Sequence, residues 1–288
     1  MRDDFAVMIV TYGRPDKQDT VKMLRNMGYS GKLILICDNT DPTVASLKEK
    51  EKCDVMVFNK KEAAKRTDTM YNRVEMKSPV YAMNYALGQA RWMGLKYVAI
   101  CDDDMKGMQF RPVIDGKLKS IKIKKADPVF EAILRFMDGT GIKAMCPARA
   151  DGYTGGAGNQ FVRDGVKYNL SQMIFLNTNI NLTFRGTLYV DFIASMDLMN
   201  DNRPAFAYMG MSVLSPGEGS NKGGCADVYE EDTDRYVAKY YAMMAHPGYV
   251  SIGWNKRKKQ FFHRVGGAVS HPYIISERWR KARSDHEK

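Results

Sequence analysis

The sequence has few cysteines, and they form neither a disulfide framework nor a zinc site. There are five among 288 residues, each alone in the chain, and no Cys-x-x-Cys pair is present. Cys37 and Cys101 each end an apolar run, which is typical of small buried side chains. This excludes a disulfide-stapled module and a zinc ribbon, and it favours a reducing compartment.

Long apolar runs are also missing. No run is long enough to span a bilayer. The N-terminus, Met1-Arg2-Asp3-Asp4, has acids where a signal peptide has a basic and then an apolar stretch. We therefore expect no membrane partner and a place in the cytoplasm of the cell or of a host.

Basic residues exceed acidic ones by a wide margin. The formal net charge is +11, and lysine and arginine gather at 117–125, 256–259 and 278–283. A solvated lysine-rich surface would explain the charge as well as a special partner would. Three separate clusters nevertheless make a polyanion such as nucleic acid a credible partner.

The first half of the chain alternates apolar runs with segments of helical spacing. This pattern predicts an α/β fold with a mixed, mostly parallel central sheet. Ligands of such sheets bind beyond the carboxyl ends of the strands, so the polar residues that follow the strands are candidate site residues. The predicted strands are 6–10, 33–37, 55–58 and 97–101, and the predicted helices are 16–27, 42–50 and 79–93.

The second half is less regular and contains no internal repeat. Its expected features are helices at 129–137 and 233–244, strands at 174–182 and 206–214, and glycine-rich loops at 152–159 and 215–224.

Three adjacent carboxylates, Asp102-Asp103-Asp104, directly follow the predicted strand 97–101. They repel one another, and a Mg²⁺ or Mn²⁺ ion among them would relieve that cost and could bridge to substrate phosphates. Alternation along an extended chain places Asp102 and Asp104 on one side. A D-x-D pattern at a strand end is how GT-A glycosyltransferases hold the metal on a donor diphosphate. The competing interpretation is an acidic helix cap or a solvated turn.

Other polar residues follow the first two predicted strands. Thr11, Tyr12 and Arg14 offer a ring for base stacking and a guanidinium for phosphate, although a turn with a surface arginine explains them equally well. Asp38 could accept from a ribose hydroxyl or could cap a turn. The segment 65–72 is dense in phosphate donors and small polar groups, which by itself fits a solvated loop.

Together these segments resemble the TET/JBP-associated glycosyltransferases, a family of bacteriophages that is related to the base J glucosyltransferase of kinetoplastids. The most specific parts are Thr67-Asp68-Thr69-Met70 and Asp102-Asp103-Asp104. One segment departs from the family pattern, because Val190-Asp191 stands where the family usually has Glu-Asp. The resemblance also covers 12–16, 38–42, 57–72, 186–189, 223–229 with its GG-x-x-D-x-Y element, and 262–265 with its His-Arg pair.

The resemblance implies a single GT-A domain, a Rossmann-like nucleotide-diphospho-sugar transferase fold. Residues 1–110 would form the nucleotide-sugar half, and residues 111–288 would form the acceptor half with a basic C-terminal tail. The donor would be a UDP-sugar, expected to be UDP-glucose, with Mn²⁺ or Mg²⁺ as cofactor. The acceptor would be DNA that contains 5-hydroxymethyluracil or 5-hydroxymethylcytosine.

The resemblance also implies residue roles. Asp102 and Asp104 would hold the metal, and His263 would complete its shell unless it is an ordinary packed histidine. Asp191 is the candidate general base for the acceptor hydroxyl, with a plain helix-start aspartate as the competing interpretation, and Asp227 is the alternative base. The donor-binding set is Thr11, Tyr12, Arg14, Asp38, Lys65, Arg66, Asp68, Thr69, Asn72 and Asp103, with Asp103 nearer the sugar or ribose.

A DNA acceptor would account for the basic clusters. Lysines and arginines would hold phosphates without reading sequence, and the target base must be flipped or single-stranded. Tyr153 and Trp254 could stack on a base, although each is more often a packing residue. The candidate DNA-binding residues are Lys122, Lys124, Lys125, Lys256, Arg257, Lys258 and Lys259.

Three other functions fit parts of the sequence. A GT-A enzyme with a non-DNA acceptor keeps the donor site. A nucleotidyltransferase also places carboxylates and Mg²⁺ after a strand, but it would be expected to have a lysine-containing phosphate loop where this chain has Tyr12-Gly13-Arg14-Pro15. A non-catalytic DNA-binding module would need only the net charge.

Overall fold

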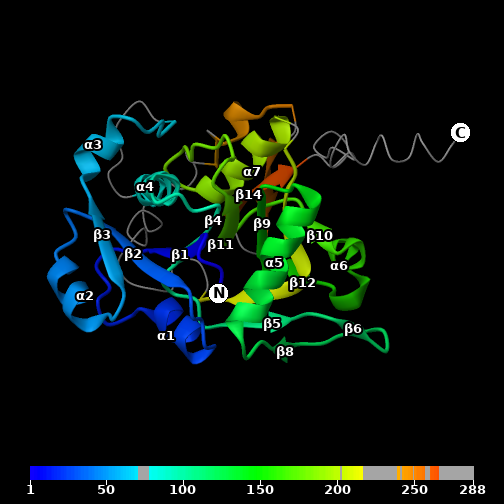
Figure 1. Cartoon of the computed structure of the whole chain (residues 1–288). Coiled ribbons are helices and arrows are strands. Elements are labelled where there is room, and N and C mark those ends of the chain that lie inside the picture. Colours follow the sequence, from blue (N-terminus) through cyan, green and yellow to red (C-terminus); the bar gives the residue numbers. More distant parts are fainter. Residues whose placement is uncertain are drawn as a thin grey trace, which may run out of the picture.

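The computed structural model is built around a mixed central sheet. It describes residues 1–70, 78–201, 203–216, 239–240, 242–248, 250–256 and 260–265. Within that part, ten strands form one sheet in the order β3-β2-β1-β4-β11-β9-β12-β5-β8, with β10 paired to β12 (Figure 1). The α/β class with a mixed sheet is therefore confirmed. No helix in these ranges is both long and apolar enough to cross a membrane.

The first half forms the parallel part of the sheet. The four predicted strands are all present, as β1 (Phe5–Val10), β2 (Lys32–Asp38), β3 (Asp54–Phe58) and β4 (Tyr97–Asp102). They pair in parallel, so their carboxyl ends lie at one edge. The helices that accompany them are α1 (Asp19–Asn26), α2 (Val44–Lys50), α3 (Lys60–Ala64) and α4 (Val80–Trp92).

The second half adds mostly antiparallel strands. β11 (Met173–Asn177) lies antiparallel between β4 and β9 (Ala144–Arg149), and β12 (Ala205–Leu214) pairs in parallel with β9. The remaining elements are β5 (Gly107–Phe110), β6 (Val113–Ile114), β7 (Lys117–Leu118), β8 (Ile121–Lys122), α5 (Ala126–Thr140), η1 (Ala150–Tyr153), η2 (Gly156–Gly158), α6 (Gln160–Asp164), β10 (Val166–Lys167), α7 (Val190–Asn200), β13 (Val250–Asn255) and β14 (Gln260–Val265).

Several predicted segments differ in length or fall partly outside the described ranges. The predicted strand 174–182 is shorter, because β11 ends at Asn177 and the chain turns there, with Ile180 N donating to Asn177 O at 3.0 Å. In the predicted helix 233–244, only 239–240 and 242–244 are described, and they are helical. In the predicted loop 215–224, residues 217–224 lie outside the described ranges.

The sheet buries an apolar core on each face. Along β1, Ala6 and Met8 belong to one core cluster, whereas Phe5, Val7 and Ile9 belong to the other, as strand alternation requires. Residues of α4 and α7 cover the first face, and residues of α1 and α5 cover the second. Helices thus cover both faces of the sheet. The polar residues lie at the ends of the strands.

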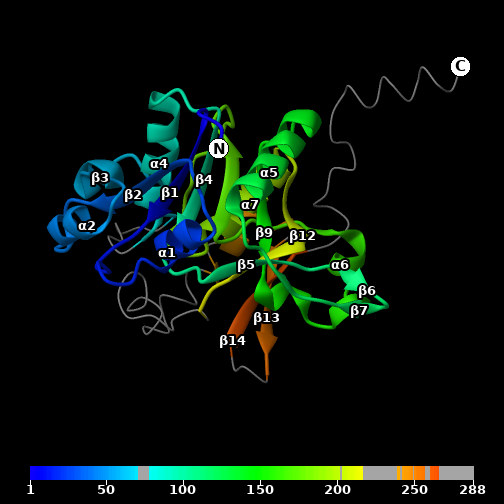
Figure 2. The same cartoon turned by 60° about the horizontal axis from the view of Figure 1, so that its bottom comes forward.

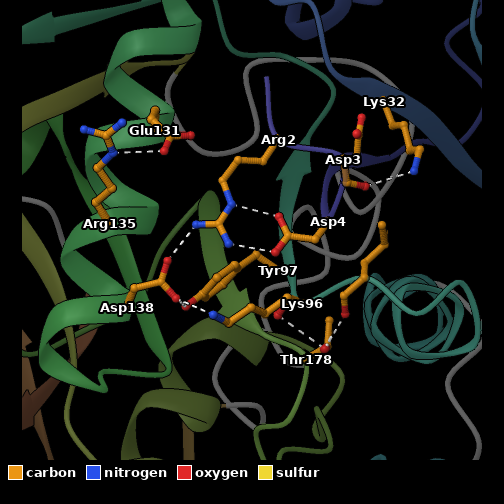
Figure 3. Close-up of polar contacts among 11 residues, drawn as sticks. Arg2, Asp3, Asp4, Lys32, Lys96, Tyr97, Glu131, Arg135, Asp138 and Thr178 are labelled. Atoms are coloured by element: carbon orange, nitrogen blue, oxygen red, sulfur yellow. Dashed lines mark hydrogen bonds and ion pairs between the residues drawn. The ribbon is translucent and has the colours of Figure 1, made fainter.

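A polar cluster ties α5 to the opposite edge of the sheet, at the amino ends of β1 and β4 (Figure 3). The Asp138 carboxylate accepts from Arg2 at 2.6 Å, Lys96 at 2.5 Å and Tyr97 Oη at 2.8 Å. Arg2 also makes a two-point pair with Asp4 at 2.8 and 2.7 Å. The bonds from Lys96, Arg2 and Tyr97 hold the pKa of Asp138 well below its usual range.

Asp138→Asn is expected to lower the free energy of unfolding by about 1 kcal/mol at pH 7, because it removes a charge shared by two cations. A depressed carboxyl pKa contributes stability above the unfolded-state value, about 4, and loses it as the pH falls toward the folded-state value. The difference in unfolding free energy between Asp138→Asn and wild type should therefore be smaller at pH 3 than at pH 7. Urea unfolding at pH 7 and pH 3 checks this, with Asp115→Asn at an exposed turn as the control. A pH-independent difference would contradict the charge assignment.

Candidate active site

The loop after β1 is tied to the acidic cluster after β4. The buried Asp103 carboxylate accepts from Thr11 Oγ1 at 2.7 Å and from Arg14 Nη1 at 2.8 Å. Gln18 Nε2 in turn donates to Thr11 Oγ1 and to Arg14 O, both at 2.9 Å. Burial raises the pKa of Asp103, whereas the Arg14 cation opposes that rise. Asp103 therefore holds together two segments that the sequence assigned to donor binding.

Asp102, Asp104 and Asp191 share one electrostatic environment. The pKa of Asp102 is raised to about 8, first by the surrounding protein atoms and then by the carboxylates of Asp104, Asp191 and Asp103. The Asp102 side chain still reaches solvent, and Asp104 is half-buried. Thr20 fixes the backbone here, because its Oγ1 donates to Asp102 O at 2.6 Å and its N donates to Asp103 O at 3.1 Å. The result is an accessible, crowded cluster of carboxyl groups.

Asp191 reaches this group from a distant part of the chain. It lies in the first turn of α7, as the competing interpretation expected, and its Oδ1 accepts from Phe192 N at 2.8 Å. The charge of Asp191 also raises the pKa of Asp102, about ninety positions earlier in the chain. A position at the start of a helix is therefore compatible with a place in the site. Sequence reasoning missed a cation here: Arg149, the last residue of β9, lowers the pKa of Asp102.

The carboxylate oxygens of this cluster suit a hard divalent cation. Carboxylate oxygens are the preferred ligands of Mg²⁺ and Mn²⁺. Burial first and the neighbouring carboxylates next raise the pKa of Asp102, and a bound cation would oppose both effects. Within the described residues, no three His, Cys, Asp or Glu side chains meet as a complete metal-ligand group. Asp102 and Asp104 could hold such an ion together with water and substrate phosphate oxygens, which is how Mg²⁺ is commonly held.

His263 lies beside the start of α7. Its ring stacks on Phe192 with centroids 4.4 Å apart and meets Tyr189 edge-on at 5.1 Å. Its Nε2 is 3.2 Å from Lys239 O, an acceptor, so this nitrogen carries the proton and Nδ1 keeps the lone pair. Burial lowers the pKa of His263 to about 4, so the ring is neutral at pH 7. Its predicted role as a metal ligand stays a prediction.

A second buried ion pair lies at the ends of β2 and β3. Asp38 Oδ2 is 3.0 Å from Lys60 Nζ, and Asp38 Oδ1 accepts from Thr40 N at 2.8 Å. Lys60 Nζ also lies 4.9 Å from the centroid of the Tyr12 ring, which is partly exposed. Lys60 was missed in the sequence because a lysine in a polar segment gives no sign of burial. Lys60 is buried because its ammonium group pairs with the Asp38 carboxylate at the end of β2.

The segment 65–70 docks against the chain that leads into α7. Gly186 N donates to Asp68 O at 2.9 Å, and Thr187 Oγ1 donates to Thr69 O at 3.1 Å. Lys65 and Arg66 are exposed. The predicted donor segment is thus joined to the residues just before Asp191, and the role of its side chains stays a prediction.

The other predicted residues are peripheral or outside the described ranges. Lys122, Lys124 and Lys125 are exposed at β8 and just after it, and Lys256 is exposed after β13. Tyr153 is buried, with its Oη 2.9 Å from Met209 O, so it packs against β12. Trp254 is about half exposed and meets Phe261 edge-on at 4.9 Å. Outside the described ranges are Asn72, Asp227, Arg257, Lys258 and Lys259.

A cavity of about 590 Å³ opens near the far end of α7. Asp197 lines it, paired with Arg185 at 2.6 and 2.8 Å and with His246 Nε2 at 2.8 Å. None of the predicted site residues line this cavity. Arg185 Nη1 also lies 3.9 Å from Asp68 Oδ2. The ion pairs of Arg185 thus connect the wall of this cavity to the segment 65–70.

Comparison with known proteins adds three findings. A family model described as TET-Associated Glycosyltransferase matches residues 5–224 of the chain. The search of curated proteins found no match. Among solved structures, the chain is similar to glucosyl-3-phosphoglycerate synthase from Mycobacterium tuberculosis, determined in complex with Mg²⁺ and uridine diphosphate. The two are 12% identical, the match covers 93% of this chain and 89% of that chain, and the TM-score is 0.49.

Proposed function

The chain belongs to the TET-associated glycosyltransferase family, and from that premise we propose that it is a metal-dependent GT-A enzyme that glycosylates DNA. The sugar, expected to be glucose, would move from a UDP-sugar to the hydroxymethyl group of a 5-hydroxymethylpyrimidine. The observation that carries the proposal is the shared environment of Asp102, Asp104 and Asp191 at the strand ends. It supports a site in which Asp102 and Asp104 would hold the metal and Asp191 would act as the base.

The donor would bind over the ends of β1, β2 and β4. Asp102 and Asp104 would hold Mn²⁺ or Mg²⁺, which when bound would neutralise charge on the departing diphosphate. Tyr12 offers a partly exposed ring for the uracil base. Asp38 lies where a carboxylate would accept from a ribose hydroxyl. Arg149 adds a positive charge beside Asp102, where it would face the diphosphate.

The acceptor would enter on the Asp191 side. The Asp191 carboxylate would accept the proton of the hydroxymethyl group as its oxygen forms a bond to the anomeric carbon. The bond from that carbon to the diphosphate oxygen breaks, and its electron pair leaves with UDP. The proton remains on Asp191 until it passes to solvent. A flipped or single-stranded target base is needed, because a paired base is not accessible to the site.

The product identifies the function. The protein is incubated with Mn²⁺, each of a panel of UDP-sugars, and DNA that contains 5-hydroxymethyluracil or 5-hydroxymethylcytosine. The DNA is then digested and its nucleosides are weighed by mass spectrometry. We expect one hydroxymethyl nucleoside to gain a hexose with one of the donors. UDP release from a donor with unmodified nucleosides throughout would instead indicate a non-DNA acceptor.

Lys60→Met is expected to weaken UDP binding by about tenfold, roughly 1.4 kcal/mol. The substitution keeps a long unbranched side chain but leaves Asp38 buried without its cation, so the end of β2 and the Tyr12 ring lose the lysine that both contact. Calorimetric titration of UDP in the presence of Mn²⁺ measures the effect. Lys61→Met, at the exposed neighbouring position, is the matched control. If the two variants bind UDP with equal affinity, Lys60 does not contribute to the donor site.

A further inference from the structure

Residues 107–123, called the arm below, start inside the central sheet, where β5 lies between β12 and β8, and continue as a two-stranded ribbon to the periphery of the molecule (Figures 1 and 2). Phe110 pairs with Ile121 at its base, and Ile114 pairs with Lys117 at its tip, in one unbroken register. Lys119 N donates to Pro112 O at 2.8 Å between these pairs. The tip is a two-residue turn, Asp115-Gly116, with φ values of 51° and 69°. Such a turn gives a tight, twisted hairpin.

The two faces of the arm have different surroundings. Paired residues lie on the same face, and successive pairs alternate between faces. One face turns toward the body, where the Arg111 guanidinium lies 4.5 Å from the centroid of the Tyr153 ring and Leu118 packs against the core. The opposite face begins with the buried pair of Met108 and Ile123.

Beyond that buried pair, the same face is no longer covered, and it carries apolar side chains together with Lys117 and Lys119. Phe110, Ile121 and Ile114 follow along it with exposed fractions of 40%, 48% and 43%. Exposed apolar side chains in a row, rather than scattered singly, mark an interaction surface. The arm therefore presents an apolar ridge that lacks a partner within the described part of the chain.

Positive charge surrounds this ridge. Residues 106–125 contain seven lysines or arginines and one aspartate, an excess of six, whereas the whole chain has a net charge of +11. The five lysines nearest the ridge are all exposed: Lys117, Lys119, Lys122, Lys124 and Lys125. A surface of this composition is complementary to a polyanion that also offers apolar contacts, namely the phosphates, groove walls and base edges of a nucleic acid.

We propose that the arm is the duplex-binding element of the enzyme, with lysines on phosphates and the apolar ridge in a groove of the DNA. This inference rests on the proposed function. A two-stranded ribbon fits the major groove, and apolar side chains of DNA-binding proteins insert at base steps and unstack them. The arm begins three residues after Asp104, so a duplex held along it would pass the site.

The length of the arm sets how much DNA it can contact. From Phe110, where the ridge becomes exposed, to Ile114 the strand advances about 13 Å at about 3.3 Å per residue. That distance corresponds to roughly four base pairs of duplex at about 3.4 Å per pair. The contribution of the arm should therefore appear only with duplexes that extend at least that far beside the target base.

Two arm variants and two matched controls test the proposal. Ile114→Ser with Ile121→Ser removes two of the three apolar side chains of the ridge, and Trp92→Ser removes an exposed apolar side chain elsewhere. Lys117→Gln with Lys119→Gln removes two charges, and Lys48→Gln with Lys52→Gln removes two exposed charges of α2 and its end. Each is titrated with fluorescent hydroxymethylated duplex at several salt concentrations, and each is assayed for hydrolysis of the UDP-sugar without DNA.

We expect the arm variants to bind long duplex about tenfold more weakly than wild type or the controls. The two-lysine variant should also lower the slope of log affinity against log salt by about 2. UDP-sugar hydrolysis should be unchanged, because no arm residue is assigned to the donor site. Transfer to a duplex shorter than the arm's reach should be the same for all variants.

Other outcomes separate the two claims. If wild type modifies DNA and the arm variants bind long duplex as tightly as the controls do, the arm is not the duplex-binding element and the proposed function stands. If wild type neither binds nor modifies DNA, both claims fail. Sedimentation with vesicles of anionic phospholipid tests the rival partner, and arm-dependent vesicle binding without DNA binding would assign the arm to a lipid surface instead.

Discussion

Replacing both Asp102 and Asp104 by asparagine is expected to lower the rate of sugar transfer about a thousandfold or more. The two carboxylates supply the charge that would hold the cation, and a bound cation contributes several kcal/mol to the departure of a diphosphate. DNA binding should survive, because neither residue belongs to a basic cluster. Transfer is measured with saturating UDP-sugar and Mn²⁺, and DNA binding is measured by fluorescence anisotropy.

A stability measurement separates catalysis from folding. In the metal-free protein, Asp102 is crowded by Asp104 and Asp191, so removal of charge should leave the melting temperature unchanged or raise it. A marked drop would show that these carboxylates are structural. Asp16→Asn is the control, because Asp16 is exposed and pairs with Lys50 away from the cluster. Transfer by the double variant in the presence of a chelator would contradict the metal assignment.

Asp191→Asn is expected to lower kcat by about 10² to 10⁴, the usual contribution of a general base. Asparagine keeps the shape of the side chain and can still accept from Phe192 N, but it cannot take the acceptor proton. UDP affinity and Mn²⁺ affinity should stay close to wild type. Single-turnover transfer to hydroxymethylated DNA measures the chemical step.

Two comparisons complete that test. Asp201→Asn, at the other end of α7 and paired with Arg203 at 2.9 Å, should transfer sugar at the wild-type rate. Asp227→Asn examines the alternative base. Full activity in Asp191→Asn together with loss of activity in Asp227→Asn would reverse the assignment.

The sequence predicts the first half of the fold well, because its strands are continuous apolar runs that end in polar residues. Helix starts are less accurate: α1 begins at Asp19, three residues later than predicted, because Gln18 bonds Thr11 and Arg14 O and keeps the preceding turn open. That turn is part of the candidate site. Its geometry depends on contacts with Asp103, far away in the chain, and a local pattern does not contain them.

The second half resists prediction for other reasons. α7 is apolar on nearly all sides, with buried residues at seven of its eleven positions, so it lacks the amphipathic period that reveals a surface helix. β9 contains Pro147, which argues against an interior strand, although the strand forms between β11 and β12. The sequence therefore proposes Asp191 as a base, but only the fold brings it next to Asp102.

The divalent-ion site is tested most directly by Mn²⁺ titration followed by electron paramagnetic resonance, with and without UDP. We predict that wild type binds Mn²⁺ and that UDP tightens this binding, because the ion would be shared between Asp102, Asp104 and the diphosphate. The Asp102→Asn, Asp104→Asn double variant should lose the UDP-dependent signal. The same UDP-dependent Mn²⁺ binding in the double variant would contradict a metal site at the end of β4.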